Sequence, residues 1–191
     1  MLVSAVELLR EHGAAALTID SVLARSGAPR GSVYHHFPGG RSQILREALR
    51  FAGDDITAKI DEAADVSASA LLRQIVTLWS EVLVNSGYSA GSPVLAAAVG
   101  SGADEQELSA VSREIFGHWR DAARDAYQRQ GFDLADATAL AHTTIAALEG
   151  AVVLSRSMRS LEPLNDVARE IEFLIKAREF VSKFGVPAVT S

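Results

Sequence analysis

Residues 18–37, TIDSVLARSGAPRGSVYHHF, decide the fold of this chain. Thr18 is a favoured N-cap residue, because its hydroxyl can accept a hydrogen bond from a backbone N–H of the first helical turn. Gly27, a typical helix stop, follows about two turns later. Pro29 is well tolerated in the first turn of a second, short helix that reaches Phe37. The stretch therefore predicts two helices joined by a tight turn, which is the helix-turn-helix unit.

The second helix of this unit has an outer face suited to DNA. An α-helix fits the major groove, where side chains contact the edges of the bases. Gly31 and Ser32 are small, so the start of the helix can approach DNA closely, and its free N–H groups favour phosphate. The residues expected on this outer face are Arg30, Gly31, Ser32 and His35.

The rest of the chain has the pattern of helices separated by short breaks of Gly, Pro or Asp. Strand patterns are nearly absent from the sequence, so we predict an all-α protein of nine helices. The other seven helices are expected at about 2–12, 41–64, 67–85, 94–99, 104–130, 134–158 and 163–184. We predict a helix-turn-helix domain at residues 1–46 and a ligand-binding and dimerisation domain at residues 47–191.

Composition excludes several classes of protein. Hydrophobic residues make up 48% of the 191 residues and charged residues 22%, which suits a sizeable core. There is no cysteine, which excludes disulfide scaffolds and thiolate sites and favours a cytoplasmic protein. The start of the chain lacks the basic segment of a signal peptide, and Glu7 interrupts its apolar stretch. We expect no apolar run that approaches the roughly 18 residues needed to span a bilayer, and therefore no membrane partner.

Charge is distributed unevenly along the chain. Although the net charge is −6, residues 1–50 contain six Arg and four acidic residues. Residues 51–191 contain twelve basic and twenty acidic residues. The sequence thus predicts a slightly basic head on an acidic body, as a DNA-binding head would have. An excess this small also arises by chance, so charge alone does not identify a nucleic-acid partner.

The head resembles the tetracycline-repressor (TetR) family of transcriptional regulators. The run at 28–40, APRGSVYHHFPGG, is closest to the LmrA-like subgroup of multidrug-efflux repressors. The chain departs from the family pattern at Leu23, where Ala is usual, and at Gly39-Gly40, which adds a residue to the turn. The matching residues, at the spacing of the family signature, are Thr18, Ser26-Gly27, Gly31-Ser32, Tyr34 and His36-Phe37.

This resemblance implies two sets of DNA contacts. The residues expected at phosphates are Thr18, Tyr34, His36 and Arg41. The residues expected at base edges are Arg30, Ser32 and His35. The alternatives are that Tyr34 lies at the edge of the core and that Arg41 is an ordinary solvated charge. No metal site is expected at His35 and His36, because adjacent helical residues point about 100° apart.

The body contains aromatic residues that the resemblance places around an inducer. Ligand pockets are mostly apolar, with a few polar anchors. We expect walls from Trp79, Leu83, Phe116 and Trp119, and polar anchors from His142 and Glu149. Two Trp rings favour a small aromatic or polycyclic compound, and no cofactor is expected. A packed core without a ligand is the alternative, because aromatic residues at helical spacing are normally core residues.

The last two helices are expected to form a dimer interface. Gly within a helix costs stability, so close packing against another helix is a natural reason for the cluster of small residues around Gly150. The resemblance implies a four-helix contact between two copies of the chain, whereas packing of the same faces within one copy is the alternative. The residues expected at the interface are Ala147, Gly150, Ala151, Leu154, Ile171 and Leu174.

Together these features predict a homodimeric repressor that binds a pseudo-palindromic operator and is released by a small inducer. An enzyme is not expected, because the sequence lacks the Glu-x-x-His pairs of carboxylate metal sites, a phosphate-cradling loop and a His-Glu-x-x-His pair. No Gly-x-Ser-x-Gly nucleophile elbow is expected either. The alternative function is a helical interaction module whose helix-turn-helix contacts protein instead of DNA.

Overall fold

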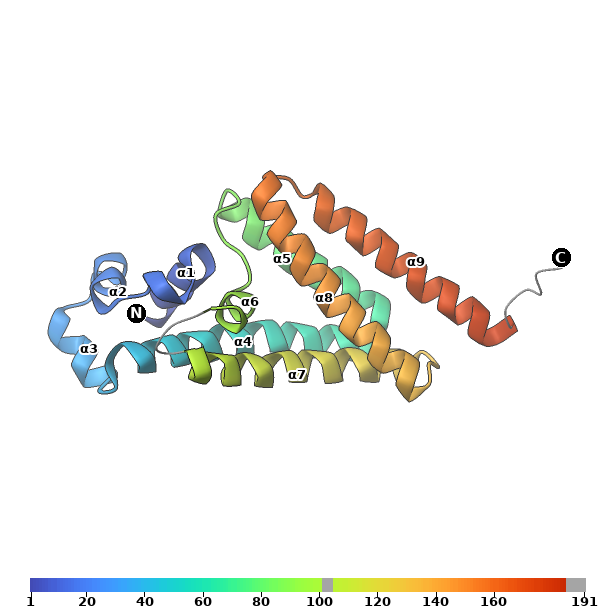
Figure 1. Ribbon diagram of the computed structural model, residues 1–191, viewed down its shortest axis with the longest axis horizontal. Coiled ribbons are helices and arrows are strands. Elements are labelled where there is room, and N and C mark those ends of the chain that lie inside the picture. The colour runs from blue at the N-terminus through green and yellow to red at the C-terminus, as the bar shows by residue number, and fades with distance from the viewer. Residues whose placement is uncertain (101–104, 185–191) are drawn as a thin grey trace.

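The computed structural model describes residues 1–100 and 105–184. Within these ranges it contains nine α-helices and one turn of 3-10 helix, without strands (Figure 1). This confirms the all-α prediction. The predicted helix ends lie within two residues of the observed ones, and the predicted start at residue 104 lies outside the described residues.

The head lies at one end of the molecule and consists of α1 (Leu2–His12), α2 (Ile19–Ser26) and α3 (Arg30–His36) (Figure 1). Thr18 caps α2, because its Oγ1 accepts a hydrogen bond from the Ser21 N–H at 3.0 Å. The Ser21 Oγ in turn accepts from the Thr18 N–H at 2.8 Å. The helix stops at Gly27, whose φ of 67° lies in the left-handed region that glycine adopts readily. Both ends of α2 therefore lie where the sequence predicts them.

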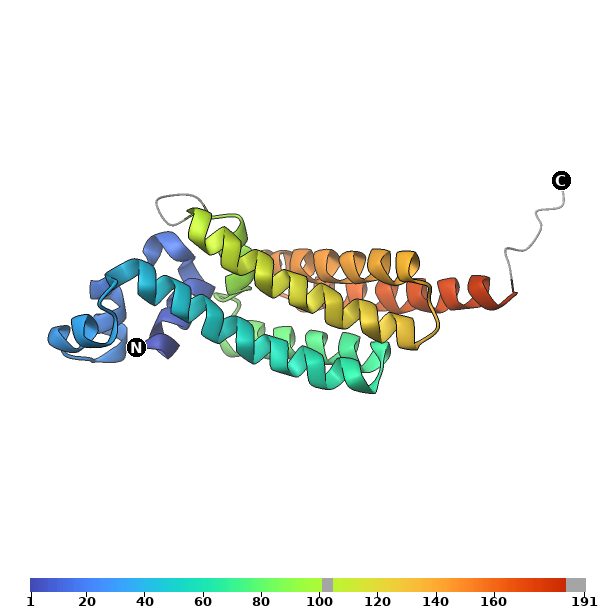
Figure 2. The ribbon, with the colours of Figure 1, turned by 90° about the horizontal axis from the view of Figure 1, so that it is seen from below.

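The helix α4 (Gly40–Val66) links the head to the body, and α7 (Glu105–Arg129) lies beside it (Figure 2). The two helices approach closely at Gly53. A Cβ added there would lie 2.5 Å from Ile115 Cδ1, so a glycine is what lets Ile115 pack against the backbone of α4. The predicted boundary between residues 46 and 47 falls inside α4, so the two predicted domains share a continuous helix.

The body is completed by α5 (Ala68–Asn85), α6 (Pro93–Ala98), α8 (Leu134–Met158) and α9 (Glu162–Phe184). The last two form an antiparallel hairpin, and α8 packs against both α7 and α9 (Figure 1).

One expectation about apolar runs is wrong. By length and composition, α8 is apolar enough to span a membrane. Its apolar window is 44% buried against the rest of the chain, and it lies between α7 and α9 as the core helix of a globular protein does. Packing inside the body therefore accounts for the apolar character of α8.

Candidate DNA-binding surface and ligand cavity

The helix α3 has one buried and one exposed face. Val33 and Phe37 are buried in the core of the head. Tyr34 is 55% exposed, which is unusual for a large aromatic side chain and leaves more than half of its surface available to a partner. The other predicted contact residues exposed around it are Arg30, Gly31, His35 and His36.

Nothing within the chain requires a glycine at position 31. A Cβ added there would meet no atom within 4 Å. Gly31 is also absent from the residues with positive φ, so its backbone conformation suits any residue. Glycine is a poor helix former. The observed geometry therefore leaves room for an external surface to approach the backbone of α3.

Three polar side chains of the head have local partners that leave them able to bind DNA. The Arg30 guanidinium lies 3.0 Å from Asp20 Oδ1 in an exposed ion pair, which is worth little and is easily exchanged. The Ser32 Oγ donates to the Pro29 carbonyl at 2.7 Å and can still accept a hydrogen bond. The Thr18 hydroxyl accepts from Ser21, so its own hydrogen remains available to a phosphate.

Arg41 has a structural role that the sequence did not indicate. Its Nε donates to the Leu17 carbonyl at 2.7 Å, and a terminal nitrogen donates to the Ala14 carbonyl at 2.7 Å. These bonds tie the start of α4 to the 3-10 turn η1 (Ala14–Ala16) that follows α1. The alternative of an ordinary solvated charge is therefore wrong. The phosphate contact stays a prediction, and it would have to share the guanidinium with these two carbonyls.

Among the described residues, the geometry supports neither a metal site nor a hydrolase nucleophile. In the described part of the chain, no group of His, Cys, Asp and Glu side chains is placed to hold a metal ion. Residues 87–91, GYSAG, match the Gly-x-Ser-x-Gly pattern of hydrolases, so the expectation that this pattern is absent is wrong at the level of the sequence. That pattern requires a strand-to-helix turn, whereas these residues follow α5, and Ser89 Oγ donates to the Ser86 carbonyl at 2.9 Å.

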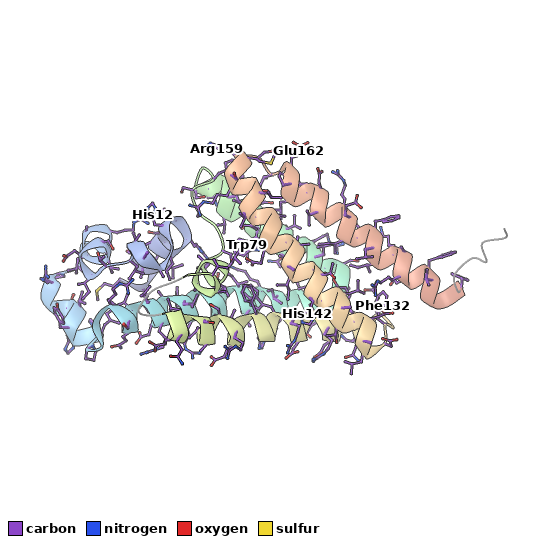
Figure 3. The ribbon with its side chains drawn as sticks, viewed as in Figure 1. His12, Trp79, Phe132, His142, Arg159 and Glu162 are labelled. Atoms are coloured by element: carbon purple, nitrogen blue, oxygen red, sulfur yellow. The ribbon has the colours of Figure 1, made fainter. Side chains whose placement is uncertain are left out.

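A small apolar cavity lies in the body between α4, α5, α7 and α8. Three predicted ligand residues line it, namely Trp79, Trp119 and Glu149, and Figure 3 shows Trp79 among the helices of the body. The Trp119 ring is fixed by a hydrogen bond from its Nε1 to Thr57 Oγ1 at 2.8 Å. The space open to the centre of a water molecule is about 20 Å³, which suits a single water. A larger ligand would have to displace side chains.

The other three predicted ligand residues do not line this cavity. Leu83 is fully buried and packs in the core. Phe116 and His142 instead line an open groove between α7 and α8, next to the cavity. The Phe116 ring contacts Trp119 edge to face, with ring centroids 5.3 Å apart. Glu149 lines both the cavity and the groove.

Glu149 is the buried ionisable group of the cavity, with only 6% of its surface exposed. Burial raises the pKa of its carboxyl to about 7, and a hydrogen bond with the Ser92 hydroxyl acts in the opposite direction. Its Oε2 has no hydrogen-bond partner among the described residues. Ser92 is the N-cap of α6, and the sequence offered no signal that it would meet Glu149.

The structure corrects two residues of the predicted dimer interface. Ala151 and Ile171 are 1% and 4% exposed, so both pack within the chain and have almost no surface to offer a partner. Leu154 is 52% exposed and Gly150 is also exposed, whereas Ala147 and Leu174 are partly buried.

The exposed apolar residues of the α8–α9 hairpin were mostly missed. They are Leu134, Val153, Leu154 and Met158 on α8, and Phe173, Phe180, Val181 and Phe184 on α9. The three Phe residues recur at helical spacing, so they share one face of α9. The spacing was readable from the sequence, but a second apolar stripe on α9 hid which face would remain exposed.

The head contacts the body at several points besides α4. The Gly91 N–H, just before Ser92, donates to the Arg10 carbonyl of α1 at 2.9 Å. The guanidinium of Arg156, on α8, donates to the Glu11 carbonyl at 2.6 Å. The end of α1 is thus bonded both to the loop before α6 and to α8.

Comparison with known proteins agrees with this architecture. Residues 1–48 match bacterial regulatory proteins of the tetR family, and residues 68–170 match the C-terminal domain of LmrA/YxaF-like transcriptional regulators. An uncharacterized HTH-type transcriptional regulator of Mycobacterium tuberculosis is 39% identical over 183 residues, which is 93% of each chain. The HTH-type transcriptional regulator LmrA of Bacillus subtilis is 25% identical over 179 residues, covering 92% of this chain and 95% of LmrA.

The fold is also that of solved regulators. The crystal structure of the regulatory protein TetR from Rhodobacter sphaeroides superposes with a TM-score of 0.80 at 19% identity, covering 89% of this chain and 94% of that one. The matched families and relatives are transcriptional regulators, not enzymes. On this evidence the chain belongs to the TetR family of bacterial regulatory proteins and has an LmrA/YxaF-like C-terminal domain.

Proposed function

We propose that this regulator is a cytoplasmic, homodimeric repressor that a small apolar or aromatic compound releases from its operator. The exposed face of α3 is the observation that favours DNA over a protein partner. Tyr34 stands exposed there, and Gly31 leaves the backbone open to close approach. Phosphate contacts from the exposed polar side chains would position the helix, and Arg30 would contact a base edge.

The exposed Phe face of α9 and the small residues of α8 support a dimer. An apolar surface of this kind, on a folded domain, marks a contact with another molecule. A two-fold pairing would place two heads on one side of the dimer, as a pseudo-palindromic operator requires. Half-sites for helix-turn-helix dimers lie about 10 bp apart, or at multiples of that spacing.

The helix α4 connects the cavity to the head, so a ligand in the cavity can alter the position of the head. Ile56 and Ile60 of α4 line it, and α4 begins beside the DNA-binding helix α3. A ligand that displaces these side chains would shift α4 and change the spacing of the two heads. Such a ligand weakens operator binding only if it binds the shifted arrangement better than the operator-bound one.

The test is a binding titration with fragments of the DNA upstream of the protein's own gene, at several salt concentrations. We expect sequence-specific binding that weakens steeply with salt, and a loss of about 1–3 kcal/mol for Arg30→Ala or Tyr34→Ala. Circular dichroism checks that both variants remain folded. If the wild-type protein binds none of the fragments in a salt-dependent manner, or if both variants bind like wild type, the proposed DNA contacts are wrong.

A further inference from the structure

We propose that the cavity between Trp79 and Trp119 accepts a singly charged organic cation with a flat apolar body, and that the Glu149 carboxylate is its charge partner. The inference rests on the proposed inducer function and adds the charge of the ligand to it. It starts from the unusual position of Glu149, a buried carboxyl group at a cavity whose other lining side chains are mostly apolar, with Lys59, Gln74 and Thr144 as the polar exceptions.

The Glu149 carboxyl has no partner that explains its burial. It is 6% exposed, and its Oε2 makes no hydrogen bond within the described residues. A buried polar group without a partner costs free energy, and a buried charge costs more. An apolar side chain of similar size would avoid that cost. A partner supplied from outside the chain would account for the carboxylate.

The cations of the surrounding helices do not neutralise it. Lys59 of α4 lines the same cavity, but its Nζ lies 2.8 Å from Asp55 Oδ2 in an ion pair. Arg120 of α7 lines the groove and is paired with Asp121 at 2.8 Å. Arg113 of α7 and His142 of α8 also line the groove. The raised pKa of Glu149 reflects its burial, opposed by the hydrogen bond with the Ser92 hydroxyl.

The rest of the cavity suits an organic cation. The faces of Trp rings attract cations, and both rings here are almost completely buried, where that attraction is strongest. The hydrogen bond from Trp119 to Thr57 holds one ring in place. An anion would instead be repelled by the Glu149 carboxylate.

The groove beside the cavity provides the room that the cavity itself lacks. Glu149 and Ile145 line both spaces, so they form the partition between them. Movement of these two side chains would join the cavity of about 20 Å³ to the groove. A flat cation could then lie against the Trp rings with its charge at Glu149.

The protonation of Glu149 makes this binding depend on pH. With a pKa of about 7, the carboxyl is mostly protonated in mild acid. A permanent cation must then displace that proton, so its affinity should rise with pH through about 7 and level off above it. The other charged or ionisable groups that line the cavity or the groove around Glu149 are Lys59, Arg113, Arg120 and His142. The Glu149→Gln variant retains all four, so it separates the effect of Glu149 from any effect of these groups.

The experiment compares two probes of the same shape, 1-methylquinolinium and uncharged 1-methylnaphthalene, by equilibrium dialysis against the full chain from pH 5.5 to 8.5. For the cation at pH 8, we expect affinity to fall about 10- to 100-fold in Glu149→Gln, as for loss of a close charge pair at a binding site. Glu62→Gln, an exposed acid on α4 outside the cavity, is the matched control and should bind like wild type. The neutral probe should bind Glu149→Gln as well as wild type, or better.

Three results would overturn the proposal: equal affinity of wild type for the two probes, an unchanged cation affinity in Glu149→Gln, or no binding of either probe. Operator binding is measured separately without probes. If operator binding persists while the cation fails to bind, only the ligand class is wrong. If the wild type binds no operator, the proposed repressor function is wrong whatever the probes do.

Discussion

At the scale of single residues, the most informative positions are those that the fold itself does not explain. Gly31 has open space around it, and the buried Glu149 has one carboxylate oxygen, Oε2, without a hydrogen-bond partner among the described residues. Arg41 is the opposite case, because two backbone carbonyls of the head account for its guanidinium. Where packing does not require the residue, or leaves one of its polar atoms without a hydrogen bond, contact with DNA or with a ligand is the natural explanation for its presence.

Replacement of Gly31 tests whether close approach of DNA is the reason for a glycine at this position. Gly31→Leu should leave the thermal midpoint equal to wild type or higher, because the site is open and Leu is a better helix former. The added side chain should block close approach and weaken operator binding by about 1–3 kcal/mol, as loss of a good contact does. Gly117→Ala is the control. This glycine of α7 also has open space, so its replacement should stabilise the protein without changing operator affinity. Normal operator binding by Gly31→Leu would remove Gly31 from the DNA surface.

Glu149 should also make the stability of the protein depend on pH. Its pKa is about 7 in the folded chain and 4.5 in the reference state, so the folded chain favours the protonated form. The group therefore stabilises the fold below about pH 4.5, and this contribution is lost as pH rises through 7. From pH 5 to pH 8, Glu149→Gln should gain about 2–3 kcal/mol in free energy of unfolding relative to wild type, measured in urea. A constant difference between the two proteins would mean that the carboxyl is not buried as described.

At the scale of helices, the sequence predicts where each helix begins and ends, but it does not predict which face of each helix is buried. Thr18 and Gly27 set the ends of α2 through local hydrogen bonds and a left-handed conformation, both of which are typical of those residue types. On α9 the sequence offers two apolar stripes, and packing against α8 and α5 decides which is buried. Ile171 lies on the buried stripe and Phe173 on the exposed one. The partnership of Glu149 with Ser92 joins α8 to α6 and likewise depends on tertiary packing.

The approach of α4 to α7 depends on Gly53. In Gly53→Ala the new Cβ would lie 2.5 Å from Ile115 Cδ1, so either the side chain or the helix must move. Overpacking of this kind costs about 1–3 kcal/mol, partly offset by the better helix propensity of Ala. In a double-mutant cycle with Ile115→Ala, the double variant should be more stable than the sum of the single effects by about 1 kcal/mol or more. Additive effects in urea unfolding would show that the two positions are not in contact.

At the scale of the whole molecule, the proposed function depends on two surfaces that remain exposed in the described part of the chain. One is the outer face of α3, and the other is the Phe face of α9. The helix α3 lies at one end of the molecule, and α9 extends toward the other end (Figure 1). A dimer through the second surface would leave the first free for DNA.

The dimer is tested by placing charge on its expected surface. Phe173→Glu together with Phe180→Glu should abolish both the dimer and operator binding, because each charge would be buried without a partner. Gly150→Glu on α8 should act in the same way. Val66→Glu is the matched control, because Val66 is an exposed apolar residue at the far end of α4. Sedimentation should show monomers for the first two variants and dimers for the control. An intact dimer in the double Phe variant would place the interface elsewhere.

Communication between the cavity and the head should use α8 as well as α4. Arg156 lies two helical turns beyond Glu149, and its guanidinium holds the Glu11 carbonyl at the end of α1. A ligand that moves Glu149 moves α8, and this bond transmits the movement to the head. Arg156→Ala should therefore retain operator affinity in the absence of ligand but lose part of the release that ligand causes, which is typically 5- to 150-fold.

Because coupling is reciprocal, operator should weaken ligand binding less in Arg156→Ala than in wild type. Part of the coupling should remain, since Ile56 and Ile60 still connect the cavity to α4. Arg169→Ala, which removes an exposed arginine of α9 paired only with its neighbour Asp166, is the control and should respond like wild type. The measurement is operator affinity by fluorescence anisotropy, with and without saturating 1-methylquinolinium. Full release by the probe in Arg156→Ala would leave α4 as the route of communication and exclude the α8–α1 bond from it.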